Sequence, residues 1–178
     1  MISDRPEGIY EDAPEVSERC MERASKFLSY KPRTRHELIK HLTERGFGME
    51  EASLCADRME EYRLIDDLEY SRMYFEAMFE RGKGQDRIRR ELAEKGVDRN
   101  TIEDSLLLIE EVPDAYEAAL DQAQMALAAE DVRDLTYEER EKIKGRIARR
   151  LARKGYPVDA IYRAVREALE IRLSQEEE

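Results

Sequence analysis

The chain has 178 residues, of which 41% are charged and 41% hydrophobic, and its formal net charge at pH 7 is −11. Its length suffices for one domain or a short array of small ones, and its acidic balance argues against indiscriminate binding of nucleic acid. A stretch of ~18 apolar residues, a secretory signal and a cysteine framework are all missing, so we expect a reduced, cytoplasmic protein with no membrane contact.

The first elements follow an acidic segment over residues 1–14, which we expect to be a mobile tail. Apolar residues then recur at helical spacing and predict a three-helix repeat over residues 15–66. Thr34 and Glu37 form a capping box at the start of its second helix. Gly46 suits the end of that helix, because glycine readily adopts the left-handed conformation found there.

A second three-helix repeat is predicted over residues 67–112, with Gly82-Lys83-Gly84 as a turn between its first two helices. A third repeat follows over residues 113–173, and residues 174–178 form a short acidic tail. No extended β-branched run interrupts the helical pattern. The chain is therefore predicted to be all-α, with about nine helices in tandem repeats and no sheet.

One five-residue signature occurs three times with identical internal spacing. Each copy has two apolar residues four apart, a cation, a glycine and a hydrophobic residue: Leu38, Leu42, Arg45, Gly46 and Phe47; Ile88, Leu92, Lys95, Gly96 and Val97; and Ile147, Leu151, Lys154, Gly155 and Tyr156. The spacing predicts a buried stripe, a left-handed glycine and a Schellman ending in which the last residue packs against the second apolar one. Unrelated helices also end in Lys-Gly or Arg-Gly, but the threefold recurrence favours stacked helical repeats.

Candidate catalytic groups are sparse. His36 and His41 are five residues apart, whereas metal ligands on one helical face are three or four apart. Gly82-Lys83-Gly84 is too short for a phosphate-binding loop, and helix capping accounts for the acidic start at Asp66-Asp67. Cys55 falls on a buried face, which predicts an inert thiol. We therefore expect no enzyme activity and no catalytic, cofactor-binding or metal-binding residue.

Clustered cations are the stronger functional feature. On a helix over residues 137–154, five of them occupy a stripe about 100° wide that faces away from Ile147 and Leu151. Such a stripe suits an acidic surface or phosphates, although the acidic segment 107–139 of the same chain is an alternative partner. No aromatic residue interleaves the basic runs, so stacking on single-stranded bases is not favoured. The candidate partner-binding residues are Arg33, Arg35 and Lys40 in the first repeat, Arg81, Lys83, Arg87, Arg90 and Lys95 in the second, and Lys142, Arg146, Arg149, Arg150, Arg153 and Lys154 in the third.

Three segments carry a resemblance to a known family. They are the run Arg63-Leu64-Ile65-Asp66-Asp67-Leu68-Glu69-Tyr70-Ser71, the turn Arg81-Gly82-Lys83-Gly84 with the following Ile88, Leu92, Gly96 and Val97, and the opening Lys31-Pro32-Arg33-Thr34-Arg35-His36-Glu37-Leu38. In this order they resemble the family of the regulatory protein RecX, strongly over residues 20–110 and weakly over residues 140–170. The resemblance implies three-helix repeats in an elongated, curved array. It also implies binding along the groove of the RecA recombinase filament, inhibition of its ATPase, strand exchange and coprotease activities, and some affinity for DNA.

These observations together favour a monomeric, RecX-like regulator of the RecA filament in DNA repair, recombination and the SOS response. Single- or double-stranded DNA is a second, weaker partner, and no cofactor is expected. Two other interpretations remain open on the residues alone. One is a helical DNA-binding transcription regulator with a helix-turn-helix-like pair, and the other is a general helical adaptor whose charge segregation has no function.

Overall fold

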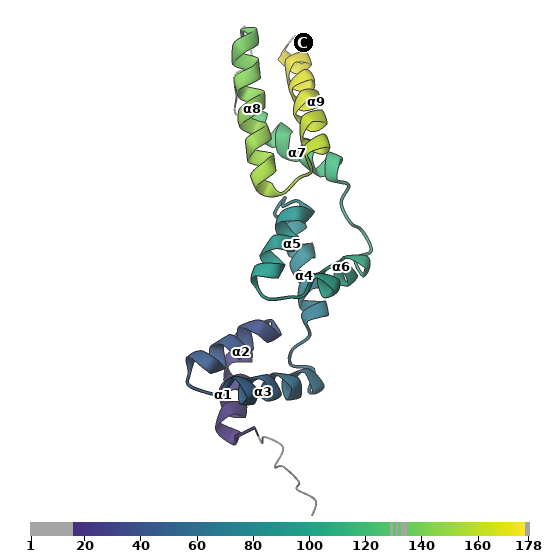
Figure 1. The fold of residues 1–178 in the computed structure, drawn as a ribbon. Helices are drawn as coiled ribbons and strands as arrows, with labels where there is room; N and C mark the ends of the chain where they lie inside the picture. Colours follow the sequence, from purple (N-terminus) through teal and green to yellow (C-terminus); the bar gives the residue numbers. More distant parts are fainter. Residues whose placement is uncertain (1–15, 129, 131, 133–134, 177–178) are drawn as a thin grey trace, which may run out of the picture. The chain divides into compact units, whose positions relative to one another are not determined.

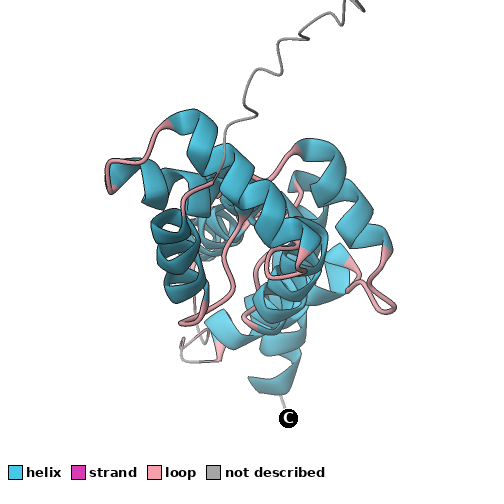
Figure 2. Ribbon diagram, turned by 90° about the horizontal axis from the view of Figure 1, so that it is seen from below, coloured by secondary structure: helices cyan, strands magenta, loops and turns pink. Residues whose placement is uncertain are grey.

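The computed structural model describes residues 16–128, 130, 132 and 135–176, and within these ranges it consists of nine α-helices without a strand (Figures 1 and 2). The predicted all-α class is confirmed. The predicted tail over residues 1–14 and the last two residues of the 174–178 tail lie outside the described residues. The helices are α1 (Glu18–Leu28), α2 (Arg35–Glu44), α3 (Met49–Glu61), α4 (Asp67–Glu80), α5 (Gln85–Glu94), α6 (Arg99–Leu107), α7 (Ala115–Leu127), α8 (Tyr137–Lys154) and α9 (Val158–Glu176).

Three hydrophobic cores hold these helices together. The chain divides into two compact units, Met1–Asp67 and Leu68–Glu178. The first unit contains one core, built by α1 to α3, and the second contains two, built by α4 to α6 and by α7 to α9. Each core buries the apolar pair of one signature copy: Leu38 with Leu42, Ile88 with Leu92, and Ile147 with Leu151. One core for every three helices supports the proposed division into three repeats.

The Schellman endings predicted by the signature are present in all three copies. The glycines adopt the left-handed conformation, with φ of 91° at Gly46, 81° at Gly96 and 88° at Gly155. In each copy the residue after the glycine donates its backbone N–H to the carbonyl of the second apolar residue: Phe47 to Leu42 at 3.2 Å, Val97 to Leu92 at 3.2 Å and Tyr156 to Leu151 at 3.3 Å. The bond satisfies a carbonyl that the helix end would otherwise leave unpaired.

Two further helices end in the same way, although the signature did not predict them. α4 is followed by Gly82, whose φ is 66°, and Lys83 donates its N–H to the carbonyl of Met78 at 3.0 Å. α3 is followed by Arg63, and Leu64 donates to the carbonyl of Met59 at 2.9 Å. Arg63 has a φ of 56° and is the only non-glycine residue with positive φ in the described part of the chain.

Other local predictions also hold. The Thr34 and Glu37 capping box begins α2, and Thr136 with Glu139 forms a second capping box at the start of α8. Cys55 is fully buried beside Cys20, and burial raises the pKa of both thiols, that of Cys20 to about 12. Burial and a raised pKa both disfavour the reactive thiolate, which is consistent with the inert thiol predicted for Cys55.

Candidate partner-binding surfaces

The densest basic surface lies on α8, which begins at its capping box and ends at Gly155. Ile147 and Leu151 are buried on one side of this helix. Four cations on other faces are exposed and make no ion pair with a described carboxylate, and we call them the α8 basic face: Lys142, Arg149, Arg150 and Arg153. Solvent-exposed charge without an internal partner is free to meet a partner of opposite charge.

Arg146 differs from the α8 basic face because it has an internal partner. Its guanidinium lies 2.6 Å from the carboxylate of Glu130, which belongs to the acidic segment that follows α7. The alternative partner raised by the sequence, the acidic segment 107–139, is thus observed at this position. Arg146 remains 57% exposed, so the ion pair is a surface contact of modest strength.

The second repeat uses two of its candidate cations internally. Glu91 on α5 accepts hydrogen bonds from the ammonium of Lys83 at 2.8 and 2.9 Å, from Nε of Arg87 at 2.8 Å and from the hydroxyl of Tyr74 at 2.8 Å. Burial alone would raise the pKa of Glu91, but these hydrogen bonds outweigh it and lower the pKa to about 2. Lys83 and Arg87 therefore neutralise a carboxylate of their own repeat.

The residues from Gly84 to Arg87, next to this cluster, also form a junction between the second and third repeats. Arg87 donates from its guanidinium to the carbonyl of Arg153 at 3.1 Å, and the N–H of Gly84 donates to the carbonyl of Lys154 at 2.7 Å. These carbonyls lie in the last turn of α8, where cations and donors are favourable. Lys154 donates in turn to the side-chain amide oxygen of Gln122 on α7. Burial, followed by the charges of Arg150 and Arg87, lowers the pKa of Lys154.

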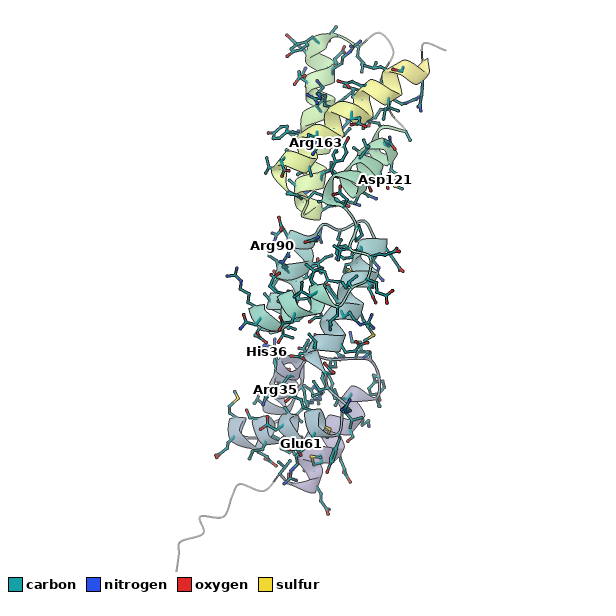
Figure 3. All side chains as sticks on the ribbon, turned by 90° about the vertical axis from the view of Figure 1, so that its right-hand side faces the viewer. Arg35, His36, Glu61, Arg90, Asp121 and Arg163 are labelled. Carbon is teal, nitrogen blue, oxygen red and sulfur yellow. The ribbon has the colours of Figure 1, made fainter. Side chains whose placement is uncertain are left out.

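The remaining cations of the second repeat are placed differently. Lys95 lies over the rings of Tyr70 and Tyr74, 5.9 and 5.7 Å from their centroids. Arg81 is exposed, and so is Arg90 (Figure 3). Nε of Arg90 donates to the carbonyl of Asp86 within its own helix at 3.2 Å. Of the five candidates in this repeat, Arg81 and Arg90 are the two that are exposed and form no ion pair with a described carboxylate.

Among the three candidates in the first repeat, Lys40 is exposed and Arg33 and Arg35 are half-buried. The guanidinium of Arg33 lies 4.4 Å from the ring centroid of Phe27. Arg35 forms ion pairs with Asp57 and, at 3.3 Å, with Glu60, and both acids lie on α3. Arg35 therefore joins α2 to α3 within the first unit.

Sequence reasoning missed an exposed face of α9. Tyr162 is 69% exposed, and it lines a groove between α8 and α9 together with Arg166 and with Arg149 of the α8 basic face. The apolar spacing of α9 indicates only its buried residues, such as Ile161 and Val165. The four-residue spacing of Tyr162 and Arg166 could have indicated this second face. An aromatic side chain from another helix therefore lies next to the basic helix, although no aromatic residue interleaves the basic run itself.

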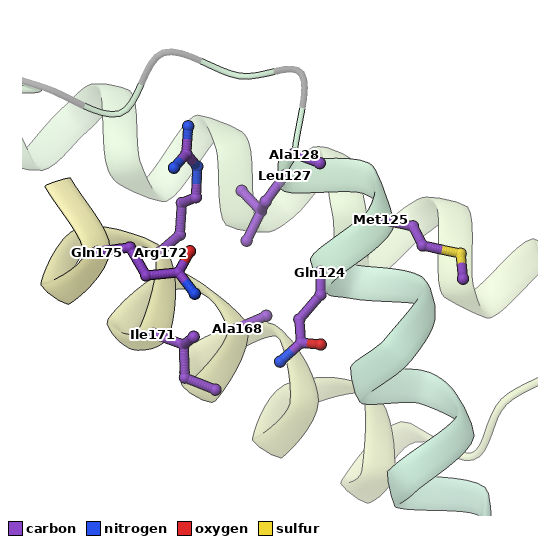
Figure 4. Close-up of a pocket in the computed structure, with 8 residues that line it drawn as sticks. All are labelled: Gln124, Met125, Leu127, Ala128, Ala168, Ile171, Arg172 and Gln175. Carbon is purple, nitrogen blue, oxygen red and sulfur yellow. The ribbon is translucent and has the colours of Figure 1, made fainter.

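A second hollow lies between α7 and α9 and has a volume of about 430 Å³ (Figure 4). Its lining includes Gln124, Met125, Ile171, Arg172 and Gln175. These side chains do not form a nucleophile with an adjacent base, which is the arrangement that covalent catalysis requires. Across the described ranges no three His, Cys, Asp or Glu side chains gather into a possible metal site, and no described helix is long and apolar enough to cross a membrane.

Comparison with known proteins gives consistent matches. Two family models match: "RecX, first three-helix domain" over residues 20–59 and "RecX, second three-helix domain" over residues 66–106. The regulatory protein RecX of Mycolicibacterium smegmatis is 30% identical over 165 residues, which are 92% of this chain and 87% of that protein. RecX of Streptomyces coelicolor is 33% identical over 146 residues, or 82% and 74% of the two chains. The crystal structure of RecX from Lactobacillus salivarius has a TM-score of 0.69 at 25% identity and covers 84% of this chain and 94% of that one.

Proposed function

The chain belongs to the family of RecX regulatory proteins, and from this premise we propose that it binds the RecA nucleoprotein filament and inhibits its ATPase, strand exchange and coprotease activities. It acts by binding and not by catalysis. Occupation of the filament groove across neighbouring RecA subunits would hinder the motions that accompany ATP turnover. The consequence would be slower turnover and a filament that disassembles more readily.

The observation that carries this proposal is the α8 basic face. Its four cations are exposed and form no ion pair with a described carboxylate, although the charge of Lys142 lowers the pKa of Glu139, in a chain whose net charge is −11. A filament that carries DNA presents phosphates and acidic side chains, and opposite charge accelerates association and fixes orientation. Arg81, Arg90 and Lys40 are also exposed and would add contacts from the other two repeats.

The test is the RecA ATPase on single-stranded DNA with substoichiometric wild-type protein. We expect inhibition by the wild type and its loss in the triple variant Arg149→Glu, Arg150→Glu and Arg153→Glu. A matched control reverses three exposed cations elsewhere, Lys26, Arg58 and Arg99, and so changes the net charge equally. Unchanged ATPase and unchanged filament length with wild-type protein would exclude the proposal. Equal loss in both triple variants would show that net charge, and not this surface, matters.

We further propose a monomer with weak affinity for DNA alone, and the exposed arginines of the α8 basic face are what favours DNA as a second partner. Phosphate contacts by such residues make binding strongly dependent on salt. Gel shifts on duplex and single-stranded DNA across a salt series would measure this affinity. Tight, sequence-selective binding without RecA would instead support a transcription regulator. Sedimentation equilibrium would check the monomer.

A further inference from the structure

A groove of about 520 Å³ runs between α8 and α9, which pack side by side (Figure 1). Its volume lies within the range of sites that hold a ligand or an inserted side chain. The floor is apolar, because Val165 is buried there and Ala148 and Gly145 add no polar side chain. Tyr162 stands at the edge with 69% of its surface exposed. The remaining lining residues are charged: Glu141, Lys144, Arg149 and Arg166.

Gly145 is an unfavourable residue at its position in the fold. It lies in the middle of the 18-residue helix α8, where glycine is worse than any residue except proline. Its φ is not positive, and a Cβ at this position would meet only the guanidinium of Arg149, at 3.4 Å. Neither backbone conformation nor crowding therefore requires a glycine here. Positions that break a local rule without structural need tend to be functional, and this one leaves the groove open.

The rim of the groove is positively charged. Lys144 is paired with Glu141 at 2.8 Å, so these two charges offset each other. Arg166 lies 4.0 Å from Glu170, but both side chains are about 70% exposed, and such a contact is weak. Arg149 has no carboxylate partner among the described residues. Its place on the α8 basic face makes the rim continuous with that surface.

We propose that this groove docks an acidic protein segment that inserts one large apolar side chain between α8 and α9. The apolar floor would bury the inserted side chain, Tyr162 would cover it, and Arg149 and Arg166 would meet carboxylates on either side. An acidic protein segment fits better than nucleic acid, because the apolar floor can bury an apolar side chain and Glu141 in the lining would repel a phosphate. The inference deepens the proposed function by naming the chemistry of the segment that a partner presents, but docking can be measured without RecA.

The experiment uses the full chain and short fluorescein-labelled synthetic peptides. One peptide carries Asp and Glu around a central Phe-Leu pair, a second replaces that pair by Ser-Ser, and a third replaces the acids by Lys. We expect anisotropy to report binding of the first peptide only. Gly145→Leu, which fills the groove, and Arg149→Glu should each weaken binding at least tenfold. Leu favours helix more than Gly does, so Gly145→Leu should not lower the thermal midpoint.

Several results would overturn the docking site. They are equal binding of the Ser-Ser peptide, unchanged binding by Gly145→Leu, or displacement of the peptide by an oligo-dT strand at lower concentration than by unlabelled peptide. RecA inhibition by a protein that binds none of the peptides would overturn the groove and leave the proposed function intact. Selective peptide binding by a protein that leaves RecA ATPase unchanged would support the groove and overturn the proposed function.

Discussion

The backbone N–H of Gly84 donates a 2.7 Å hydrogen bond to the carbonyl oxygen of Lys154, which joins the turn before α5 to the last residue of α8. The two turns are in direct backbone contact. A Cβ on Gly84 would lie 2.2 Å from the carbonyl oxygen of Gly155, and a Cβ on Gly155 would lie 2.4 Å from the Cβ of Arg87. Gly155, the signature glycine of the third repeat, thus ends α8, and its lack of a side chain also allows Arg87 of the second repeat to pack against it.

This contact predicts that Gly84→Ala destabilises the second unit although Gly84 does not need a left-handed conformation. The added methyl cannot fit against backbone atoms, so the junction must open, at a cost of about 1–3 kcal/mol in the free energy of unfolding. Urea denaturation followed by circular dichroism would measure the change. Gly48→Ala is the matched control, since a Cβ there meets nothing within 4 Å and its φ is −63°. If Gly84→Ala and Gly48→Ala change the free energy of unfolding equally, the junction accommodates the added methyl without a measurable cost.

A second prediction concerns Glu91 and acid stability. The pKa of its carboxyl is about 2 in the folded chain, against an ordinary value of 4.5. The stability that the ionised Glu91 adds to the folded state is therefore fully present above pH 4.5, and it is lost as the pH falls from 4.5 towards 2. Because the side chain is only 19% exposed, we expect Glu91→Gln to lower the free energy of unfolding at neutral pH by about 3 kcal/mol.

Denaturant titrations at neutral pH and at about pH 3 would test this, because the difference between wild type and Glu91→Gln should shrink in acid. Glu94→Gln on the same helix is the control, since Glu94 is exposed. A constant difference at both pH values would indicate that the substituted amide disturbs packing and that the lost charge is not the cause.

Much of the fold could be predicted because its rules are local. A pair such as Leu42 and Gly46 specifies a buried stripe and a helix end within five residues, and three copies make the pattern recognisable. The ending at Arg63 was missed because the residue that adopts the left-handed conformation there is not a glycine. The junction of Gly84 with Lys154 was missed for another reason, since it depends on where two distant turns meet.

The candidate site was less predictable, because charge in a sequence does not show which cations are already paired. The Arg87 and Glu91 spacing of four residues could have indicated an internal ion pair, but the contact of Arg87 with the carbonyl of Arg153 could not be seen. Conversely, the spacing on α8 alone could identify Arg149 and Arg150 as exposed. Tyr162 could not be assigned to this surface from the sequence, because its place there depends on the packing of α9 beside α8.

The conformation of Arg63 yields a third prediction. A left-handed non-glycine residue carries strain of about 1 kcal/mol, and glycine at this position is free of it. Arg63→Gly should therefore raise the free energy of unfolding of the first unit by about 1 kcal/mol. Arg58→Gly is the counterpart, because Arg58 is exposed within α3 and the same change should there cost about 1 kcal/mol. Both are measured by urea denaturation, and a loss of stability in Arg63→Gly would mean that its side chain contributes contacts.

The last prediction concerns His41, whose ring stacks on Phe27 with centroids 3.9 Å apart and an angle of 5° between the planes. Burial lowers the pKa of His41, and the nearby charges of Arg45, Arg23 and Arg33 lower it further, against an opposing effect of Glu44. The folded state thus favours the neutral ring. Above its ordinary pKa of 6.5, His41 is neutral in both states and does not affect the free energy of unfolding. As the pH falls through 6.5, the unfolded state binds a proton before the folded state does, and this favours unfolding.

The first unit should consequently lose stability as the pH falls below about 6.5, and His41→Gln should remove most of that dependence. His36→Gln is the matched control, because His36 lies on the same helix but is exposed. Urea midpoints at several pH values would measure the slope for each protein. If the pH dependence of the urea midpoint survives in His41→Gln and disappears in His36→Gln, the responsible histidine is His36. That result would contradict the role of the stacked ring.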